Sequence, residues 1–263
     1  MYRLFFIAFL GWMCVGCDSP KSVEQDNQTT NATQKEKPKV NETFKPQYVS
    51  KVESEIVLDG AGTEKDWDKA EWRNLDQLML GDAPTKEDFN GRYKLLWDER
   101  MLYILAEIQD DVFIDINKDG LDHYWDDDCF EIFIDQDRSR GDHKFNYNAF
   151  AYHISLDDKV VDIGIDESPL YLNDHLKLSK KKEGNQMTWE VGIKVYSDKY
   201  NDKSPEDSRV KLATKDKIGF MVAYCDNDSS KERESFIGDM FIKGEDKNKG
   251  WIDAGVFGQI NLK

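Results

Sequence analysis

Apolar and polar residues alternate along residues 129–135, Cys-Phe-Glu-Ile-Phe-Ile-Asp, and this pattern predicts a β-strand. Phe130, Ile132 and Ile134 share one side of such a strand, because successive side chains point to opposite faces. We therefore expect these three residues in a hydrophobic core and Glu131 on the opposite face.

Similar short patterns follow one another along the rest of the chain, whereas helical periodicity is nearly absent. About ten strands of this kind predict an all-β fold, an antiparallel β-sandwich. One short helix is expected at residues 63–72. The other strands are expected at residues 55–60, 92–98, 102–109, 144–154, 160–165, 176–178, 188–195, 218–226 and 259–262.

The first 17 residues have the composition of an export signal: one arginine, Arg3, is followed by an apolar run too short to span a bilayer. The end of the run, Cys14-Val-Gly-Cys17, resembles the bacterial lipobox, in which a small residue precedes the lipid-modified cysteine. This resemblance implies cleavage before Cys17 and a lipid anchor on Cys17. We expect the mature protein in the bacterial cell envelope, at the outer membrane. The alternative is an ordinary signal peptide with a free product.

Residues 18–46 are rich in Ser, Thr, Asn, Gln, Lys and Glu and carry almost no large apolar side chain. Such a segment cannot bury enough surface to offset the entropy of ordering, so a disordered linker is expected. Residues 47–263 remain for one folded domain, which is long enough to bury a large core.

The chain is acidic, with 52 Asp and Glu against 36 Lys and Arg and a net charge of −16. A nucleic-acid partner is therefore not expected, because binding phosphates requires a basic surface. Outside the leader only Cys129 and Cys225 remain. Two thiols are too few for a disulfide framework or for a zinc site of about four ligands. Two buried free thiols are expected, and a Cys129–Cys225 disulfide is the alternative.

Trp125 and three consecutive acids, Asp126 to Asp128, directly precede the strand at residues 129–135. A flat aromatic ring beside carboxylates suits a sugar, which offers C–H-rich faces for the ring and hydroxyls for the acids. A surface acid run beside a core tryptophan is the alternative interpretation.

Motifs spread over residues 56–263 together resemble the family 9 carbohydrate-binding modules, a branch of the DOMON-like β-sandwiches of jelly-roll type. The motifs, in chain order, are Leu58-Asp-Gly60 with Asp66-Trp67, Trp97-Asp98 with Leu102-Tyr-Ile104, Trp125-x-x-Asp128-x-x-Glu131-Ile-Phe-Ile-Asp135, Trp189-Glu-Val-x-Ile193, Gly219-Phe220, and Phe257-Gly-x-Ile260.

The resemblance implies a protein that binds sugars and catalyses no reaction, holding the end of a glycan chain between two tryptophan rings. Trp125 and Trp251 match the two rings, and Glu131 and Asn248 match polar residues of the slot. Asn146 stands where the family pattern has an arginine, so the position stays polar but a charged donor is lost.

Partners implied by this resemblance are the ends of oligo- or polysaccharides, in support of carbohydrate catabolism. The membrane is the further partner, through the lipid anchor, and a monomer is expected. Insertions at residues 157–173 and 200–215 are expected to reshape or cover the slot. The remaining tryptophans of the domain are expected in the core: Trp67, Trp72, Trp97 and Trp189.

A calcium site is a further expectation, since the family resemblance implies structural calcium; no organic cofactor is expected. Asp115, Asn117 and Asp119 have the spacing of the first ligands of an EF-hand loop, and Asp126 falls at its twelfth position. Asp replaces the usual bidentate Glu at that position.

Three other functions remain open. Glu131 with Asp128 or Asp126 could form the carboxylate pair of a glycoside hydrolase. Met101, Met221, His123 and His153 could supply axial ligands for haem, as in haem-binding relatives of this sandwich. The third alternative is a structural lipoprotein whose slot has decayed.

Overall fold

The computed structural model describes residues 45–117 and 119–263, which form fourteen strands, four short 3-10 turns and no α-helix. The predicted all-β class is confirmed. The strands are β1 (Gln47–Lys51), β2 (Arg73–Leu75), β3 (Gln77–Gly81), β4 (Phe89–Trp97), β5 (Leu102–Asp110), β6 (Cys129–Asp135), β7 (Phe150–Ser155), β8 (Val160–Ile163), β9 (Pro169–Tyr171), β10 (Leu176–Glu183), β11 (Gln186–Ile193), β12 (Lys217–Asp226), β13 (Ser235–Gly238) and β14 (Gly258–Leu262). The turns are η1 (Lys65–Lys69), η2 (Asn173–His175), η3 (Pro205–Ser208) and η4 (Ala254–Val256).

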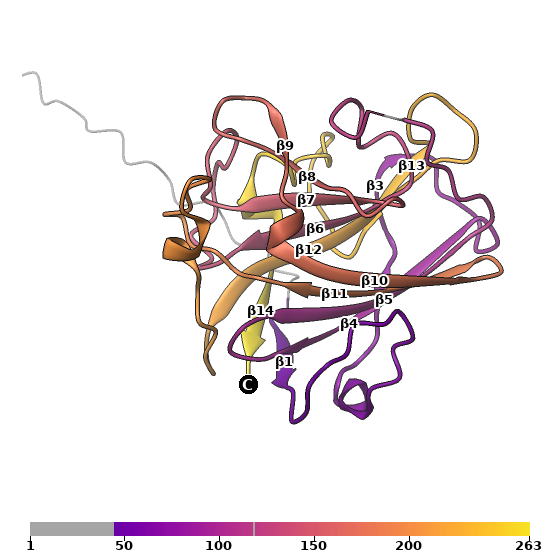
Figure 1. The fold of residues 1–263 in the computed structure, drawn as a ribbon. Helices are drawn as coiled ribbons and strands as arrows, with labels where there is room; N and C mark the ends of the chain where they lie inside the picture. Colours follow the sequence, from indigo (N-terminus) through magenta and orange to yellow (C-terminus); the bar gives the residue numbers. More distant parts are fainter. Residues whose placement is uncertain (1–44, 118) are drawn as a thin grey trace, which may run out of the picture. The chain divides into compact units, whose positions relative to one another are not determined.

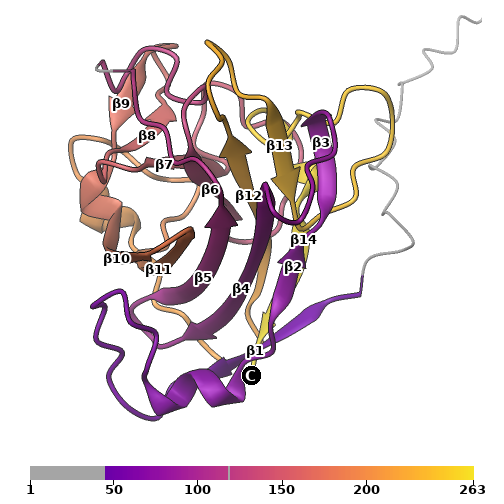
Figure 2. The same cartoon turned by 90° about the vertical axis from the view of Figure 1, so that its right-hand side faces the viewer.

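The strands form two layers. We name them the front sheet, with β3, β6 to β9 and β12 to β14, and the back sheet, with β2, β4, β5, β10 and β11; in Figure 1, β6 to β8 lie above β4, β5, β10 and β11. Strand β1 joins the two sheets, because it pairs in parallel with β14 on one side and with β4 on the other (Figure 2). The sandwich is therefore mixed and has more strands than predicted. The strands that were missed, β1, β2, β3, β9 and β13, have only three to five residues each, too few to show a clear alternation.

The main core lies between the two sheets. Phe130, Ile132 and Ile134 of β6 are buried in it, which confirms the predicted core face. Trp97 of β4 and Trp189 of β11 are fully buried in the same cluster. Trp67 is buried in a separate cluster, whereas Trp72 is only partly buried against that cluster, so three of the four tryptophans lie in the core as predicted and Trp72 lies at its edge.

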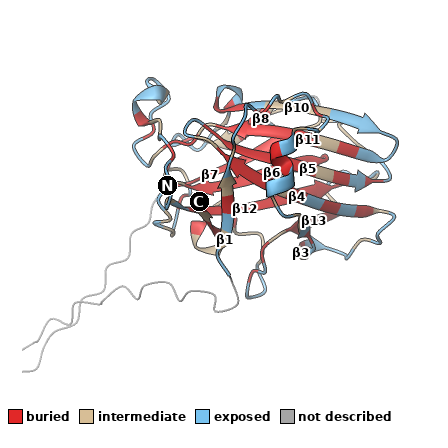
Figure 3. Ribbon diagram, turned by 90° about the horizontal axis from the view of Figure 1, so that it is seen from below, coloured by how far each residue is buried: buried red, intermediate tan, exposed pale blue. Residues whose placement is uncertain are grey.

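The outer face of β6 is also buried, which the alternation did not predict. All seven residues of β6 are buried, and Figure 3 shows the same for much of the front sheet, whereas the end of β10 is exposed. A second cluster covers this outer face with residues from the segment that follows β13. The rings of Phe133 and Phe257, for example, lie 5.6 Å apart between centroids.

The segment before β2 differs from the prediction, because residues 55–60 form no strand and the expected helix is reduced to η1. Gly60 has a φ of +80° and approaches the backbone of Lys180 so closely that a Cβ would lie 2.8 Å from its carbonyl carbon. The carboxylate of Glu190 accepts a hydrogen bond of 2.8 Å from Gly60 N. Contacts with the back sheet therefore decide this conformation.

The predicted hairpin of residues 92–98 and 102–109 is confirmed by β4 and β5. By contrast, the strand expected at residues 144–154 begins only at Phe150. Phe145 has a φ of 56°, in the left-handed region, and this interrupts an extended chain.

The leader of residues 1–17, the lipidation residue Cys17 and nearly all of the linker of residues 18–46 lie outside the described residues. Within the described part of the chain, no helix has the length and apolar character needed to cross a membrane.

Candidate functional site

A pocket of about 370 Å³ opens on the outer face of the front sheet. Its sheet residues come from β6, β7 and β8, and three loops complete its wall. The lining residues are Tyr124, Trp125, Glu131, His153, Asp162, Ile163, Arg233, Asn248 and Trp251.

The loop before β6 places Trp125 at the pocket. The indole is 36% exposed, and its ring meets the Tyr124 ring edge-on, with the centroids 4.8 Å apart. The acids that follow are buried: Asp127 accepts hydrogen bonds from two backbone N–H groups, and Asp128 accepts one of 2.6 Å from Ile114 N. The acid run therefore fixes the loop that carries the aromatic ring and is not a solvated surface patch.

A second loop, between β13 and η4, places Trp251 at the same pocket, although Trp251 is more than a hundred residues from Trp125 in the sequence. Gly250 allows this loop to lie against the front sheet, because a Cβ there would be 2.7 Å from Met221 and 2.8 Å from Phe133. His143 Nε2 lies 2.7 Å from the carbonyl oxygen of Gly250 and holds the loop.

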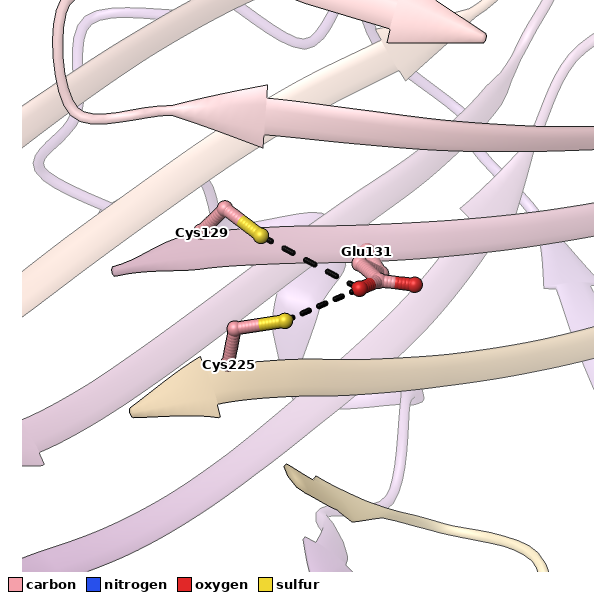
Figure 4. Close-up of side chains that lie close together, drawn as sticks. All are labelled: Cys129, Glu131 and Cys225. Carbon is pink, nitrogen blue, oxygen red and sulfur yellow. Dashed lines mark hydrogen bonds between the residues drawn. The ribbon is translucent and has the colours of Figure 1, made fainter. Parts of the chain in front are cut away.

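The polar floor of the pocket is centred on Glu131. Its Oε1 atom lies 3.1 Å from His153 Nε2 and 3.4 Å from Arg233 Nη1, and it accepts a hydrogen bond of 2.9 Å from Cys225 Sγ (Figure 4). Burial alone would raise the pKa of Glu131. The interactions with His153 and with the charge of Arg233 outweigh burial and lower this pKa below its ordinary value. Glu131 is therefore held as a carboxylate, able to accept hydrogen bonds.

Asp162 is the other acid of the pocket. Its two oxygens accept hydrogen bonds from Ala151 N and Ile163 N, at 2.8 and 2.7 Å. Burial is the main cause that raises its pKa to about 7. Asp162 belongs to the insertion at residues 157–173, so this insertion does line the pocket, whereas no lining residue comes from residues 200–215.

The structure brings together four of the five predicted sugar-binding residues: Trp125, Trp251, Glu131 and Asn248 line one pocket. Asn146 lies in an adjoining small hollow that also contacts Trp251. Its side chain bonds to the local backbone, with Oδ1 accepting from Asn148 N at 2.9 Å. The roles of all five residues in binding stay predictions.

Sequence reasoning did not select Tyr124, Asp162 or Arg233, and it considered His153 only as a haem ligand. The role of His153 could have been predicted from the sequence, because His153 lies directly opposite Glu131 in the pairing of β6 with β7. No motif or pattern in the sequence indicated Arg233. It supplies a guanidinium at the pocket, the kind of group that the chain lacks at position 146.

The four residues of the predicted calcium loop do not share one site. Asp115, Asn117 and Asp119 line a small hollow together with Asp127, and Asp126 is not part of it. None of the four belongs to the groups of converging Asp, Glu, His and Cys ligand atoms found among the described residues. The loop stays a prediction.

A different acid cluster gathers at one end of the sandwich. Asp110 ends β5 of the back sheet, whereas Asp128 precedes β6 and Asp226 ends β12 of the front sheet, and one carboxylate oxygen of each lies within 4.8 Å of the others. Asp88 and Asp228 form an adjoining group with Asp226.

The chemistry of this cluster suits a hard cation such as calcium, which prefers several oxygen ligands. Asp226 Oδ1 and Asp228 Oδ1 are buried and have no hydrogen-bond partner. Burial, together with repulsion between neighbouring acids, raises the pKa of Asp110 to about 7 and that of Asp128 to about 9. A bound cation would satisfy the unpaired oxygens and offset this repulsion.

Residues 58–263 match the family described as carbohydrate family 9 binding domain-like, and the chain therefore belongs to this family. The resemblance drawn from the motifs is thereby confirmed.

The fold is similar to solved structures of a family 9 carbohydrate-binding module from Caldicellulosiruptor kristjanssonii, one in complex with cellotriose and one in complex with glucose. Both comparisons have a TM-score of 0.60 and 21% sequence identity, and they cover 83% of this chain and 94% or 96% of the module. At this identity the likeness shows the fold alone.

Among curated proteins, endo-1,4-beta-xylanase C of Paenibacillus barcinonensis is 32% identical to this chain over 95 residues. The matched region covers 30% of this chain and only 8% of the xylanase.

Proposed function

We propose that this protein binds carbohydrate, holding the end of a glycan chain in the pocket between the rings of Trp125 and Trp251. The convergence of these two rings with the carboxylate of Glu131 carries the proposal. Aromatic rings stack on the apolar faces of a sugar, and Glu131 accepts hydrogen bonds from its hydroxyls. The solved modules of the family that hold cellotriose and glucose support a gluco-oligosaccharide as the first ligand to test.

Binding without catalysis agrees with the state of the acids. Glu131 and Asp162 are the two carboxyl groups of the pocket lining, and Asp162 has both oxygens bonded to backbone N–H groups. Asp128, a partner considered for hydrolysis, bonds to Ile114 N and Asn227 N and does not line the pocket. A hydrolase would need a second acid free to donate or accept a proton.

Replacing each ring separately tests the proposal. Trp125→Ala and Trp251→Ala should each weaken binding of cellotriose by about 5- to 30-fold, since one stacked ring contributes on the order of 1–2 kcal/mol. Isothermal titration calorimetry measures the affinity and thermal unfolding checks the fold. Trp72→Ala is the matched control, because Trp72 packs outside the pocket and its loss should leave the affinity unchanged. Unchanged cellotriose affinity in both pocket variants would refute the proposal.

The proposed setting is the outer membrane of a bacterial cell envelope, where a lipid on Cys17 anchors the mature protein in support of polysaccharide catabolism. The Cys14-Val-Gly-Cys17 pattern supports the anchor. In a Cys17→Ala variant the protein should leave the detergent-soluble membrane fraction. Retention of the variant in that fraction would contradict the proposed anchor and would leave the proposal of sugar binding unaffected.

Calcium is a separate proposal, and the unpaired oxygens of Asp226 and Asp228 favour the acid cluster as its site. Asp110, Asp128 and Asp226 would hold the ion, which would link the two sheets. Calcium at 100 times its Kd should stabilise the fold by about 2.7 kcal/mol, which is roughly 5–10 °C in Tm for a domain of this size.

Differential scanning calorimetry with calcium and with a chelator measures this shift. Asp226→Asn should abolish the shift, whereas Asp119→Asn, in the loop predicted from the sequence, should retain it. Loss of the shift only in Asp119→Asn would place the ion in the predicted loop instead.

A further inference from the structure

Two thiols, one carboxylate and one imidazole converge beneath the pocket, on three neighbouring strands. Cys129 of β6 lies directly opposite Cys225 of β12, and both are free and buried. Glu131 Oε1 lies 4.0 Å from Cys129 Sγ and 2.9 Å from Cys225 Sγ (Figure 4). His153 Nε2 of β7 approaches the same oxygen at 3.1 Å. The ligand atoms of Cys129, Glu131 and Cys225 all lie within 4.8 Å of one another, so these three can bind one ion, and His153 adjoins them through its contact with Glu131.

The tautomer of His153 supports a ligand role. Its Nδ1 atom lies 3.1 Å from the carbonyl oxygen of Ala151, which can only accept a hydrogen bond, so Nδ1 carries the proton. The other ring nitrogen, Nε2, faces Glu131 Oε1 at 3.1 Å. A backbone carbonyl that fixes Nδ1–H is the usual outer-shell partner of a metal-bound histidine.

The charges around the cluster also balance for a divalent ion. A divalent cation with two thiolates and one carboxylate leaves one net negative charge. Arg233 supplies the compensating positive charge, because its Nη1 atom donates to Cys225 Sγ at 3.1 Å and its side chain is only 9% exposed. Burying such a site is costly unless its charge is neutralised in this way.

We propose that Cys129, Cys225, Glu131 and His153 form a binding site for a thiophilic divalent metal ion, zinc in the first place. Thiolate and imidazole donors select zinc over calcium or magnesium, so this site is chemically distinct from the acid cluster. The second oxygen of Glu131 points away from both thiols (Figure 4), so the metal would lie in the pocket wall and leave that oxygen free. The proposal does not depend on sugar binding.

Cobalt is a suitable spectroscopic probe, because Co²⁺ replaces zinc and thiolate ligation gives a strong near-ultraviolet charge-transfer band. The reduced, metal-free full-length protein should bind one equivalent of Zn²⁺, measured by elemental analysis after dialysis, and should show this band with Co²⁺. Cys129→Ser, Cys225→Ser and His153→Gln should each weaken Zn²⁺ binding by about 100-fold. The two Cys→Ser variants should also reduce the cobalt charge-transfer band, because each removes one thiolate ligand. Asp226→Asn, in the acid cluster, is the control that should keep both signals.

Three results would overturn the proposal: no retained zinc in the reduced wild-type protein, an unchanged cobalt band in the double Cys→Ser variant, or isolation of the native protein with a Cys129–Cys225 disulfide. Cellotriose affinity is measured in the same variants. Full sugar binding without metal binding would refute the metal site alone, and metal binding without sugar binding would refute only the proposed function.

Discussion

Two buried glutamates occupy comparable positions on the outer faces of the two sheets, yet their surroundings differ in kind. Glu190 of β11 is closed off by the segment before β2: its carboxylate accepts hydrogen bonds from Asp59 N, Gly60 N and the indole of Trp67, at 3.0, 2.8 and 3.3 Å. Glu131 of β6 bonds to side chains and lies at an open pocket. Burial raises the pKa of Glu190, whereas the interactions with His153 and with the charge of Arg233 lower that of Glu131.

His175 and His153 repeat this contrast. His175 lies between the hydroxyls of Tyr152 and Tyr200, at 2.9 and 2.7 Å, and these hydrogen-bond partners are neutral. His153 lies at the pocket beside the carboxylate of Glu131. A buried polar group whose partners are neutral and enclosed stabilises the fold, whereas one with charged partners beside an open pocket is available to a ligand.

The largest expected effect concerns His175 and acid. Burial lowers its pKa to about 3, against an ordinary value of 6.5, so protonation favours the unfolded chain. The stability that depends on neutral His175 is present above pH 6.5 and is lost as the pH falls toward 3, by roughly 5 kcal/mol in total. Urea unfolding at pH 7 and pH 4 should show a smaller loss in His175→Gln than in the wild type. Equal losses would mean that His175 is not held neutral by the fold.

Glu190→Ala should come next, because it leaves three donors without their acceptor. We expect a loss of about 3 kcal/mol in the free energy of unfolding, measured by denaturant titration. Glu190→Gln, which keeps one acceptor oxygen, should lose less. Cellotriose affinity should stay within twofold of the wild type, and a large loss of affinity would break the contrast with Glu131.

Glu131→Gln should act mainly on binding. Removal of the carboxylate charge should weaken cellotriose binding by about 10- to 30-fold, since a hydrogen bond to a charged acceptor contributes on the order of 1.5–2 kcal/mol. Calorimetric titration provides the affinity, and the unfolding curve provides the accompanying stability change. An affinity loss no greater than in Glu190→Ala would show that the open pocket does not distinguish the two residues.

The smallest effect is expected at Asn146. Its side chain bonds to the local backbone in the adjoining hollow, and Arg233 already supplies a guanidinium at the pocket. Asn146→Ala should therefore change cellotriose affinity by less than about twofold, which is within a few tenths of a kcal/mol. A tenfold loss of cellotriose affinity would show that Asn146 takes part in sugar binding, as the family resemblance implies.

Local patterns predicted the fold class, the β4–β5 hairpin and the core face of β6, because alternation directly reports which side chains share a face. They failed where distant contacts decide the backbone. Residues 55–60 read as a strand but are held as a loop by Glu190, more than a hundred residues later in the chain. The burial of the outer face of β6 likewise depends on the segment after β13.

The pocket residues divide in the same way, into those that the sequence indicated and those that only distant contacts bring to the pocket. The family resemblance, rather than any pattern around Trp251, pointed to the second ring and to its meeting with Trp125. Arg233 and Asp162 could not be found in this way, because their positions follow from the packing of separate loops on the front sheet.

By itself, the sequence determined an acidic chain with an all-β domain, a core face on the strand at residues 129–135 and a tryptophan followed by acids at the start of that strand. Only the tertiary structure decided what these side chains meet. Strand pairing set Cys129 against Cys225 and Glu131 against His153. The physical reason is that a polar side chain takes its role from its partners and its burial, and both depend on residues that are distant along the chain.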